Sequence, residues 1–411
     1  MNMKKITAAL VSAVAIASMS AMSLTAGAAN YADDKQAEGS TTTFSKYLVM
    51  DKEANVPNAT FNYSIAAGAA KAATTAEQSE VYAGLGTPTI TNAVFEAGDT
   101  TYDTAPTEDT VELEDTEKYA KKTVTVDFTG ITFPEPGVYR YVVTEELGTG
   151  SQACDIEGSA TKTLDVYVVD TNGTLSVSNY VLYNAIIDTN DYKNEGGTSS
   201  ESDGKKVAGY QNSYDTNDLT FSKTVAGNQA SKDKYFKFTV TIENIVAGTV
   251  FDVIGKGTTF EAEPSANTAT EYSAEDMAAA NGVDDNDTLP GQQIVATSGT
   301  VTKDFYLQNG QSVKINGLPA GAKYTIVEAE EDYTPSVDNS DTKKNTETDT
   351  DTASNSTGID QDVTAAFTNT KSGTIPTGIL LSIAAPAVIG LIAIGFIVTL
   401  LAKNRRKAEE E

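Results

Sequence analysis

The chain contains no histidine, and Cys154 is its only cysteine. Without histidine it can form neither a Ser-His-Asp or Cys-His catalytic unit nor a metal site with histidine ligands. One cysteine cannot make an intramolecular disulfide, so we expect Cys154 to be a small buried or incidental residue. An exported protein that lacks disulfides needs a large core or another covalent staple.

Positive charge is also scarce, with 29 Lys+Arg against 57 Asp+Glu. This balance argues against nucleic acid as a partner, because such binding depends on basic patches. The acidic cluster at 284–287 lacks the glycine and the terminal glutamate of a calcium-binding loop, and we interpret it as a solvated loop. We therefore predict no metal site and no cofactor.

Both ends carry signals for export and anchoring. Residues 1–28 combine early lysines, an apolar run and small residues, which predicts a signal peptide cleaved after Ala28 or Ala29. Residues 379–402 are apolar over a length that suits one transmembrane helix. A basic tail follows at once: Lys403, Arg405, Arg406 and Lys407. The positive-inside bias keeps this tail in the cytoplasm.

The region between the ends predicts an all-β fold. Residues 122–128, 165–169 and 235–242 alternate apolar and polar side chains, as strands with one buried face do. Asn-Gly pairs at 172–173 and 309–310 each separate two such runs and predict tight hairpins. Many short strands between turn signals favour two tandem Ig-like β-sandwiches.

A duplicated set of motifs divides this region. Thr-Phe-Ser-Lys occurs twice, and each copy is followed by a Tyr-x-β-branched-x-Glu strand and then by an aromatic-x-Asn-Ser/Thr strand. The key residues of the two sets are Lys46, Glu145 and Asn212, then Lys223, Glu328 and Asn369. We predict a signal peptide over 1–28, domains over 29–215 and 216–371, and a C-terminal signal over 372–411. The short join between the domains predicts an end-to-end arrangement.

Polar, low-complexity stretches lie late in each predicted domain, at 188–205 and 336–362. Each falls between the glutamate strand and the asparagine strand. Segments of this composition bury little apolar surface, so we expect both to be exposed loops.

An amine, an acid and a carboxamide that recur in one order could form a Lys–Asn amide inside each domain. An exposed lysine has a pKa near ~10.4 and is protonated at neutral pH. Burial among aromatic residues such as Phe44, Tyr141 and Tyr210 disfavours the charged amine and makes it nucleophilic. Burial also favours the protonated form of the acid, which can then polarise the asparagine carbonyl and pass protons to the departing ammonia.

The plainer interpretation is that each lysine and glutamate form a surface pair and that each asparagine only ends a strand. One isolated set of three residues would favour it. Two sets in the same order, each spanning nearly a whole domain, favour the chemistry.

With these residues in view, the chain resembles Gram-positive backbone pilins built from Cna-B-like isopeptide domains, and most of all the two-domain major pilins of streptococci. The segments 135–146 and 317–328 carry the resemblance. It implies that Lys46–Asn212 and Lys223–Asn369 are bonded pairs, and it assigns the promoting acids: Glu145 and Glu328.

The C-terminal segment resembles a sortase sorting signal. The motif is Ile375-Pro376-Thr377-Gly378, shorter by one residue than the common Leu-Pro-x-Thr-Gly pattern, as in two-domain pilins. The resemblance implies cleavage between the last two residues of the motif. It also implies a lysine nucleophile shortly before the bonded asparagine, where Lys205 and Lys206 are both candidates. A plain membrane-anchored protein with an incidental turn is the alternative.

The sequence therefore predicts a structural backbone pilin that is exported, polymerised by sortase and anchored to the cell wall. Its expected partners are sortase, other copies of itself, peptidoglycan and accessory pilins, with a host surface ligand as a further candidate. A wall-anchored adhesin that is not polymerised is the first alternative. A secreted enzyme is the second, and the absence of histidine and of clustered acids in a recognisable site disfavours it.

Overall fold

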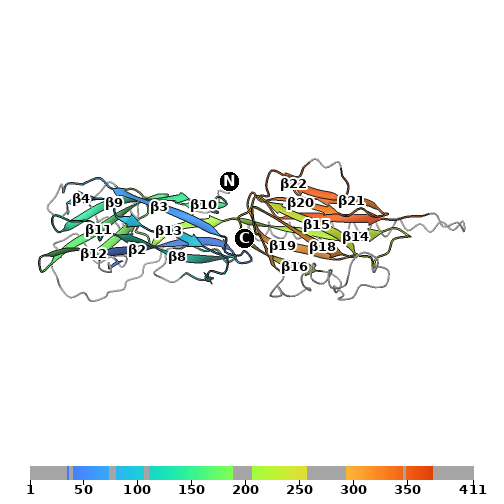
Figure 1. Ribbon diagram of the computed structural model, residues 1–411, viewed down its shortest axis with the longest axis horizontal. Coiled ribbons are helices and arrows are strands. Elements are labelled where there is room, and N and C mark those ends of the chain that lie inside the picture. The colour runs from blue at the N-terminus through green and yellow to red at the C-terminus, as the bar shows by residue number, and fades with distance from the viewer. Residues whose placement is uncertain are drawn as a thin grey trace, which may run out of the picture.

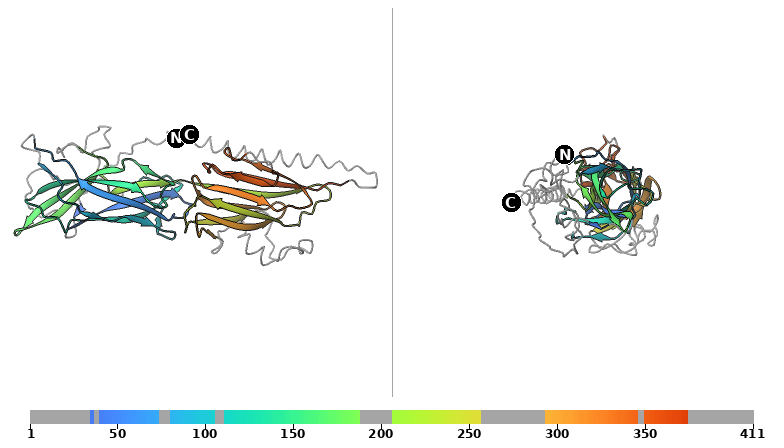
Figure 2. Two further views of the ribbon diagram at one scale, coloured as in Figure 1. Left: turned by 45° about the horizontal axis from the view of Figure 1, so that its top comes forward. Right: turned by 90° about the vertical axis from the view of Figure 1, so that its left-hand side faces the viewer.

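The computed structural model describes residues 35–36, 40–73, 80–105, 111–187, 206–256, 293–345 and 349–373. The described residues form strands, turns and loops arranged as two β-sandwiches, which confirms the predicted all-β class. The sandwiches lie end to end along the long axis of the molecule (Figure 1), as the short join predicted. The view down that axis shows the two superimposed (Figure 2).

The first sandwich pairs two sheets. One has the order β1-β12-β11-β9-β3-β6, with β4 beside β9: β1 (Lys35–Gln36), β3 (Ala59–Ala67), β4 (Val81–Ala83), β6 (Ala93–Phe95), β9 (Gly137–Leu147), β11 (Thr161–Thr171) and β12 (Thr174–Tyr183). The other has the order β10-β13-β2-β8-β5, with β7 beside β8: β2 (Thr41–Asp51), β5 (Thr89–Ile90), β7 (Thr101–Tyr102), β8 (Glu117–Asp127), β10 (Cys154–Glu157) and β13 (Gly209–Tyr214). Buried aromatic and β-branched side chains fill the space between them.

The second sandwich has the same plan with fewer strands. One sheet has the order β17-β16-β19-β14-β23-β21: β14 (Thr216–Ala226), β16 (Val250–Lys256), β17 (Gln293–Val295), β19 (Ser312–Pro319), β21 (Thr334–Asn339) and β23 (Val363–Thr370). The other has the order β18-β15-β20-β22: β15 (Phe236–Glu243), β18 (Thr300–Leu307), β20 (Lys323–Glu328) and β22 (Thr352–Asn355). A separate hydrophobic core lies between them.

Each sandwich brings its asparagine strand beside its lysine strand. β13 runs parallel to β2, and β23 runs parallel to β14, whereas most other neighbouring strands are antiparallel. Gly209 permits the first of these contacts, because a Cβ at this position would collide with the carbonyl oxygen of Ser45. The parallel pairing joins segments that are far apart in sequence.

Of the two predicted hairpins, one is confirmed and the other is wrong. Asn172 and Gly173 both have positive φ and connect the antiparallel strands β11 and β12. The strands on either side of Asn309, β18 and β19, lie in different sheets. The turn packs on β14 instead: Asn309 Oδ1 accepts a hydrogen bond from Val225 N at 2.8 Å. Both turns contain Asn-Gly, but in the second only Gly310 has a positive φ, and the contact with β14 directs the chain into the other sheet.

The prediction of one exposed loop over 336–362 is also wrong, since β22 and most of β21 lie within it. Its polar residues are partly buried in a network of side chains around the Tyr324 hydroxyl, which contacts Asn339 Oδ1 at 3.2 Å and Asp341 Oδ2 at 3.1 Å. Asn355 Nδ2 donates to the same aspartate at 2.7 Å. Hydrogen bonding lets polar residues occupy an interior that composition alone assigned to solvent.

Polar contacts hold the two sandwiches together. Lys314 Nζ lies 2.8 Å from Glu53 Oε2 of the first sandwich and 2.7 Å from Asp218 Oδ2 of the second. Asn55 Nδ2 donates to Asp252 Oδ2 at 2.8 Å. Only Asp215 separates β13 from β14, so the join has little freedom.

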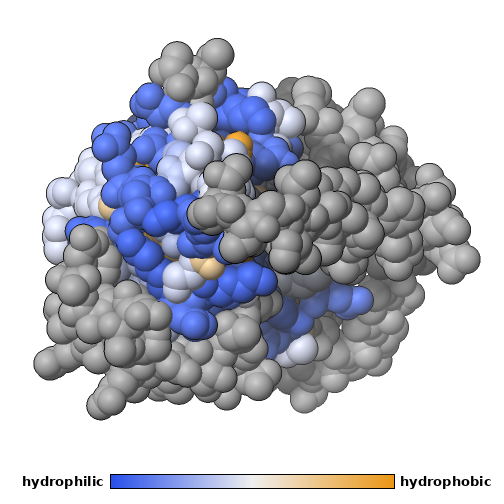
Figure 3. All heavy atoms as spheres, turned by 90° about the vertical axis from the view of Figure 1, so that its right-hand side faces the viewer, coloured by the Kyte–Doolittle hydropathy of each residue, from blue (hydrophilic) through white to orange (hydrophobic). Residues whose placement is uncertain are grey.

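Hydrophilic residues cover most of the coloured surface at the far end of the second sandwich (Figure 3).

Several predictions fall outside the described residues: the signal peptide over 1–28, the loop over 188–205, the acidic cluster at 284–287, and the C-terminal signal with its helix over 379–402. Within the described ranges, no helix has the length and apolarity needed to span a membrane. The exact domain bounds, 29–215 and 216–371, stay predictions.

Candidate functional site: two buried lysine, glutamate and asparagine clusters

In the first sandwich, Lys46, Glu145 and Asn212 meet in the core. Lys46 lies on β2 and its Nζ donates to Glu145 Oε1 at 3.0 Å and to Oε2 at 2.9 Å. The same nitrogen contacts Asn212 Oδ1 on the neighbouring strand β13. Glu145 reaches the pair from β9 in the opposite sheet. All three residues are at most 2% exposed.

Apolar surroundings set the protonation of this amine. Lys46 Nζ lies 4.0 Å from the centre of the Phe61 ring. Burial lowers the pKa of Lys46 to about 8, although the negative charge of Glu145 opposes this change. A substantial neutral fraction is therefore accessible near physiological pH, as a nucleophilic amine requires.

A tyrosine positions the acid. The Tyr63 hydroxyl on β3 donates to Glu145 Oε2 at 2.6 Å. Its ring packs at 5.4 Å from that of Phe44 and at 5.3 Å from that of Tyr210. Burial and the neighbouring carboxylate raise the pKa of Tyr63, so it stays a hydrogen-bond donor. Neither Tyr63 nor Phe61 belongs to the repeated motifs. In the sequence they are marked only by their alternate positions in an apolar strand.

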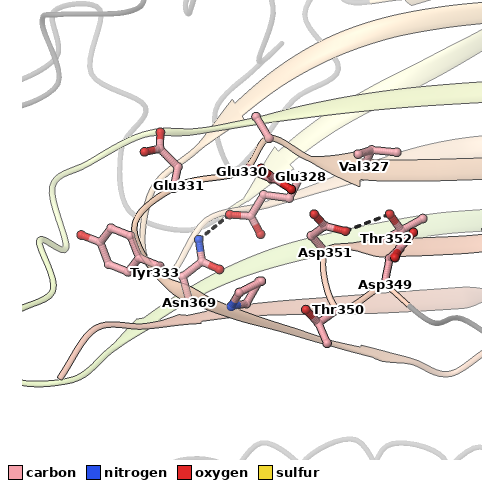
Figure 4. Close-up of a pocket in the computed structure, with 12 residues that line it drawn as sticks. Val327, Glu328, Glu330, Glu331, Tyr333, Asp349, Thr350, Asp351, Thr352 and Asn369 are labelled. Atoms are coloured by element: carbon pink, nitrogen blue, oxygen red, sulfur yellow. Dashed lines mark hydrogen bonds between the residues drawn. The ribbon is translucent and has the colours of Figure 1, made fainter.

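The second sandwich repeats the arrangement with Lys223, Glu328 and Asn369. Lys223 Nζ on β14 contacts Glu328 Oε1, and Asn369 Nδ2 on β23 donates to the same oxygen at 2.6 Å (Figure 4). Burial lowers the pKa of Lys223 to about 8. Burial also raises the pKa of Glu328, despite the opposing effect of the lysine. Both shifts favour the neutral amine and the neutral acid.

The two clusters also differ in the residue that pairs with the acid on the neighbouring strand. Tyr63 pairs with Glu145 across β3 and β9, and Phe238 pairs with Glu328 across β15 and β20. The second acid therefore has a phenylalanine where the first has a hydroxyl donor. Among the described residues, Glu328 Oε2 has no hydrogen-bond partner.

The second cluster lies beside a cavity. A cavity of about 780 Å³ borders the second cluster, and Glu328 and Asn369 both line it. Figure 4 shows carboxylates of Glu331 and Asp351 around the same space. The acid and the asparagine of the second cluster therefore lie at the wall of a polar cavity.

Asparagine atoms are left unpaired in both clusters. Within the described residues, Asn212 Nδ2 and Asn369 Oδ1 are buried without a hydrogen-bond partner. Buried polar atoms without partners cost about 1–3 kcal/mol each. Replacement of the side-chain amide nitrogen of Asn212 by the lysine nitrogen would remove the first of these unpaired groups.

The structure describes only some of the remaining predicted residues. Lys206 is only 8% exposed and forms an isolated bridge with Tyr183, whereas Lys205 and the motif residues 375–378 lie outside the described residues. Cys154 is buried beside the first core, as expected, and burial raises its pKa to about 12.

Comparison with known proteins finds an isopeptide domain family and a pilin. Residues 21–215 match the family model described as a Spy0128-like isopeptide containing domain, and residues 217–371 match a model described as a domain of unknown function. A pilin of Streptococcus pyogenes serotype M1 is 28% identical over 285 residues, covering 67% of this chain and 69% of that protein.

Solved structures show the same fold. A major pilin from Streptococcus pyogenes aligns with a TM-score of 0.51 and 22% identity, covering 82% of this chain and 100% of that one. The major pilin T3.2 from the same species aligns with a TM-score of 0.51 and 19% identity, covering 83% and 100%. The resemblance to streptococcal backbone pilins that the sequence predicted is confirmed.

Proposed function

The chain is a structural subunit of a surface pilus, of the streptococcal backbone type, and from this premise we propose that each sandwich is closed by a covalent Lys–Asn bond. The bonded pairs are Lys46–Asn212 and Lys223–Asn369. The observation that carries the proposal is the contact of Lys46 Nζ with both Glu145 and Asn212 in a buried apolar pocket.

The reaction needs only these residues. Lys46 first passes a proton to Glu145 within their ion pair. The neutral Nζ of Lys46 then attacks Cγ of Asn212, while the carboxyl of Glu145 hydrogen-bonds Oδ1 and stabilises its developing negative charge. The Cγ–Nδ2 bond then breaks, and one amine proton is relayed through Glu145 to the departing nitrogen. The products are one amide and one ammonia, so atoms and charge balance and the acid is regenerated.

The second site follows the same steps with Glu328 as the acid. Its raised pKa supports a protonated carboxyl before the reaction. Asn369 Nδ2 already donates to Glu328 at 2.6 Å, which places the leaving nitrogen beside its proton source. Each reaction happens once within its own chain, so the protein is no enzyme in the turnover sense.

The bonds suit a protein that carries tension. Each joins the first long strand of a sandwich to its last, and these strands are parallel neighbours. Force that enters at one end of the chain can pass through the bond instead of peeling strands from the sheets. The two bonds replace the disulfides that the cysteine content excludes.

We further propose that sortase cleaves between Thr377 and Gly378 and joins Thr377 to a lysine of the next copy. Of the two candidate acceptors, the burial of Lys206 favours Lys205. The finished polymer would then be attached to peptidoglycan, with accessory pilins as further partners. A membrane-held precursor precedes these steps.

Intact mass spectrometry of the exported region tests the internal bonds. We expect a deficit of two ammonia molecules, and we expect Glu145→Ala and Glu328→Ala each to restore one. Conservative Glu→Gln changes at the same positions control for packing and should behave alike. An unmodified mass in the parent protein would contradict the proposed chemistry.

Denaturing gels of cell-wall extracts test polymerisation. A pilus subunit gives a ladder of high-mass species, whereas a non-polymerised adhesin gives one monomer band. Lys205→Ala should collapse the ladder and Lys206→Ala should not. A ladder that survives both single changes would refute both candidate acceptors.

A further inference from the structure

The first site contains a second buried lysine that the reaction does not consume. Lys162 lies on β11 and is 2% exposed. Its Nζ donates to Asn184 Oδ1 at 2.6 Å and lies 3.3 Å from Asn184 O. The same nitrogen lies 4.9 Å from the centre of the Tyr210 ring. Two oxygen acceptors and an aromatic face favour a charged ammonium at this place. Burial lowers the pKa of Lys162 to about 8, which still leaves the ammonium as the main form at neutral pH.

Strand register connects Lys162 to the reacting cluster. It pairs with Val143, which is two residues before Glu145 on β9, so Lys162 and Glu145 share one face of the sheet. Tyr210 pairs with Lys46 across β13 and β2, and its hydroxyl donates to Val143 O at 2.8 Å. The Tyr210 ring therefore contacts the ammonium of Lys162 and stands beside the strand position of Lys46.

The second sandwich provides an internal comparison. Ala353 pairs with Ile326, which is two residues before Glu328, so it occupies the position equivalent to Lys162. The backbone confirms the equivalence: Glu145 N donates to Ala160 O, and Glu328 N donates to Asp351 O, in each case two residues before the position compared. Only the first site has a buried cation there.

We propose that Lys162 is a positioning residue of the first cross-link: its ammonium, held by Asn184 against Tyr210, increases the fraction of Lys46 that is neutral and nucleophilic. This inference rests on the Lys46–Asn212 bond proposed above and adds a residue that controls how readily that bond forms.

Charge explains the effect. Two ammonium groups in one apolar core repel each other, and the repulsion is relieved when Lys46 loses its proton. Burial is the main cause of the lowered pKa of Lys46, and the charge of Lys162 adds to it, while Glu145 acts against both. The ionisable groups that face this space are Lys46 from β2, Glu145 from β9, Tyr63 from β3, Tyr210 from β13 and Cys154 from β10.

The test measures how fast the first bond forms as a function of pH. The exported region carrying Glu328→Ala, which silences the second bond, is made by cell-free synthesis, and loss of one ammonia is followed by intact mass. With Lys162→Met added, we expect bond formation to slow at least threefold at neutral pH and the midpoint of the rate–pH profile to move upward. Lys162→Arg retains the charge and should restore much of the rate.

If Lys162 had only a structural role, the midpoint of the rate–pH profile would not move in Lys162→Met. Asn184→Ala keeps Lys162 but removes the side-chain oxygen that accepts its hydrogen bond. It should move the midpoint of the rate–pH profile upward by a smaller amount. This variant replaces Lys162→Met in the test if circular dichroism shows that Lys162→Met does not fold. If Lys162→Met forms the bond at the same rate and with the same midpoint as the parent, the proposed role of Lys162 is wrong, while the bond itself stands. The same result in Asn184→Ala decides the question if only that variant folds. If the parent itself loses no ammonia, the proposed function fails instead.

Discussion

Lys46 and Asn212 lie 166 positions apart in the chain, yet their side chains touch across two parallel neighbouring strands. The contact closes the first sandwich into a loop that contains nearly all of its residues. Glu145 reaches the same point from the opposite sheet, so both layers of the sandwich contribute to one cluster.

Removal of the first bond should cost much of the stability of its sandwich. In the loop-entropy model, a closure of this length stabilises by roughly 5 kcal/mol. Asn212→Ala should lower the urea midpoint of the first sandwich accordingly, measured by circular dichroism. Ser213→Ala changes the next residue on the same strand, where the side chain faces the other way, and it should have little effect. Equal midpoints in both variants would contradict a covalent closure.

The unbonded first sandwich should gain stability as pH rises. In Asn212→Ala, Lys46 keeps its amine, and its folded pKa of about 8 lies below the ordinary lysine pKa of 10.5. Between these values the unfolded chain holds more protons than the folded chain, so the free energy of unfolding increases with pH across this window. Urea unfolding at pH 7.5 and 9.5 measures it. Lys46→Met in the same background should reduce the dependence, and Lys162, whose pKa burial also lowers to about 8, should account for the remainder. An unchanged dependence in Lys46→Met would contradict the role of Lys46.

Glycine at position 209 should be needed for the parallel pairing of β13 with β2. A Cβ there meets the backbone of Ser45, which cannot move without shifting β2. Gly209→Ala should destabilise the first sandwich by about 1–3 kcal/mol and slow formation of the first bond. Gly130→Ala is the matched control, because a Cβ at Gly130 meets nothing within 4 Å. Normal ammonia loss and stability in Gly209→Ala would show that the strands can separate without cost.

A buried ion pair should matter more than an exposed one. Arg140 Nε and Nη2 donate to Asp165 Oδ1 and Oδ2, both at 2.8 Å, and both side chains are at most 3% exposed. Arg140→Met leaves the aspartate buried without its guanidinium and should cost about 3–5 kcal/mol. Lys343→Met removes the exposed pair with Asp360 and should cost at most about 1 kcal/mol. Thermal unfolding compares the two, and similar losses would refute the burial argument.

Much of the site could be predicted from sequence because its residues recur. The duplicated order of lysine, glutamate and asparagine identified six residues, and the structure gathers them in two buried clusters. Tyr63 and Lys162 could not be predicted in this way. Neither belongs to a repeated motif, since Phe238 and Ala353 occupy the equivalent places in the second sandwich. Both residues come close to the cluster only through the pairing of their strands with β9, which the sequence does not show.

The sequence by itself determined the all-β class, the repeated division and the residue types that can form an amide, because alternation of apolar side chains and recurrence of motifs are local features of the chain. Only the tertiary structure shows that the strand after Asn309 joins the other sheet, that polar residues after position 336 are buried by hydrogen bonding, and which residues surround each lysine. These outcomes depend on contacts between distant strands. Burial creates the low dielectric that changes the chemistry of an amine, and only the packed fold creates burial.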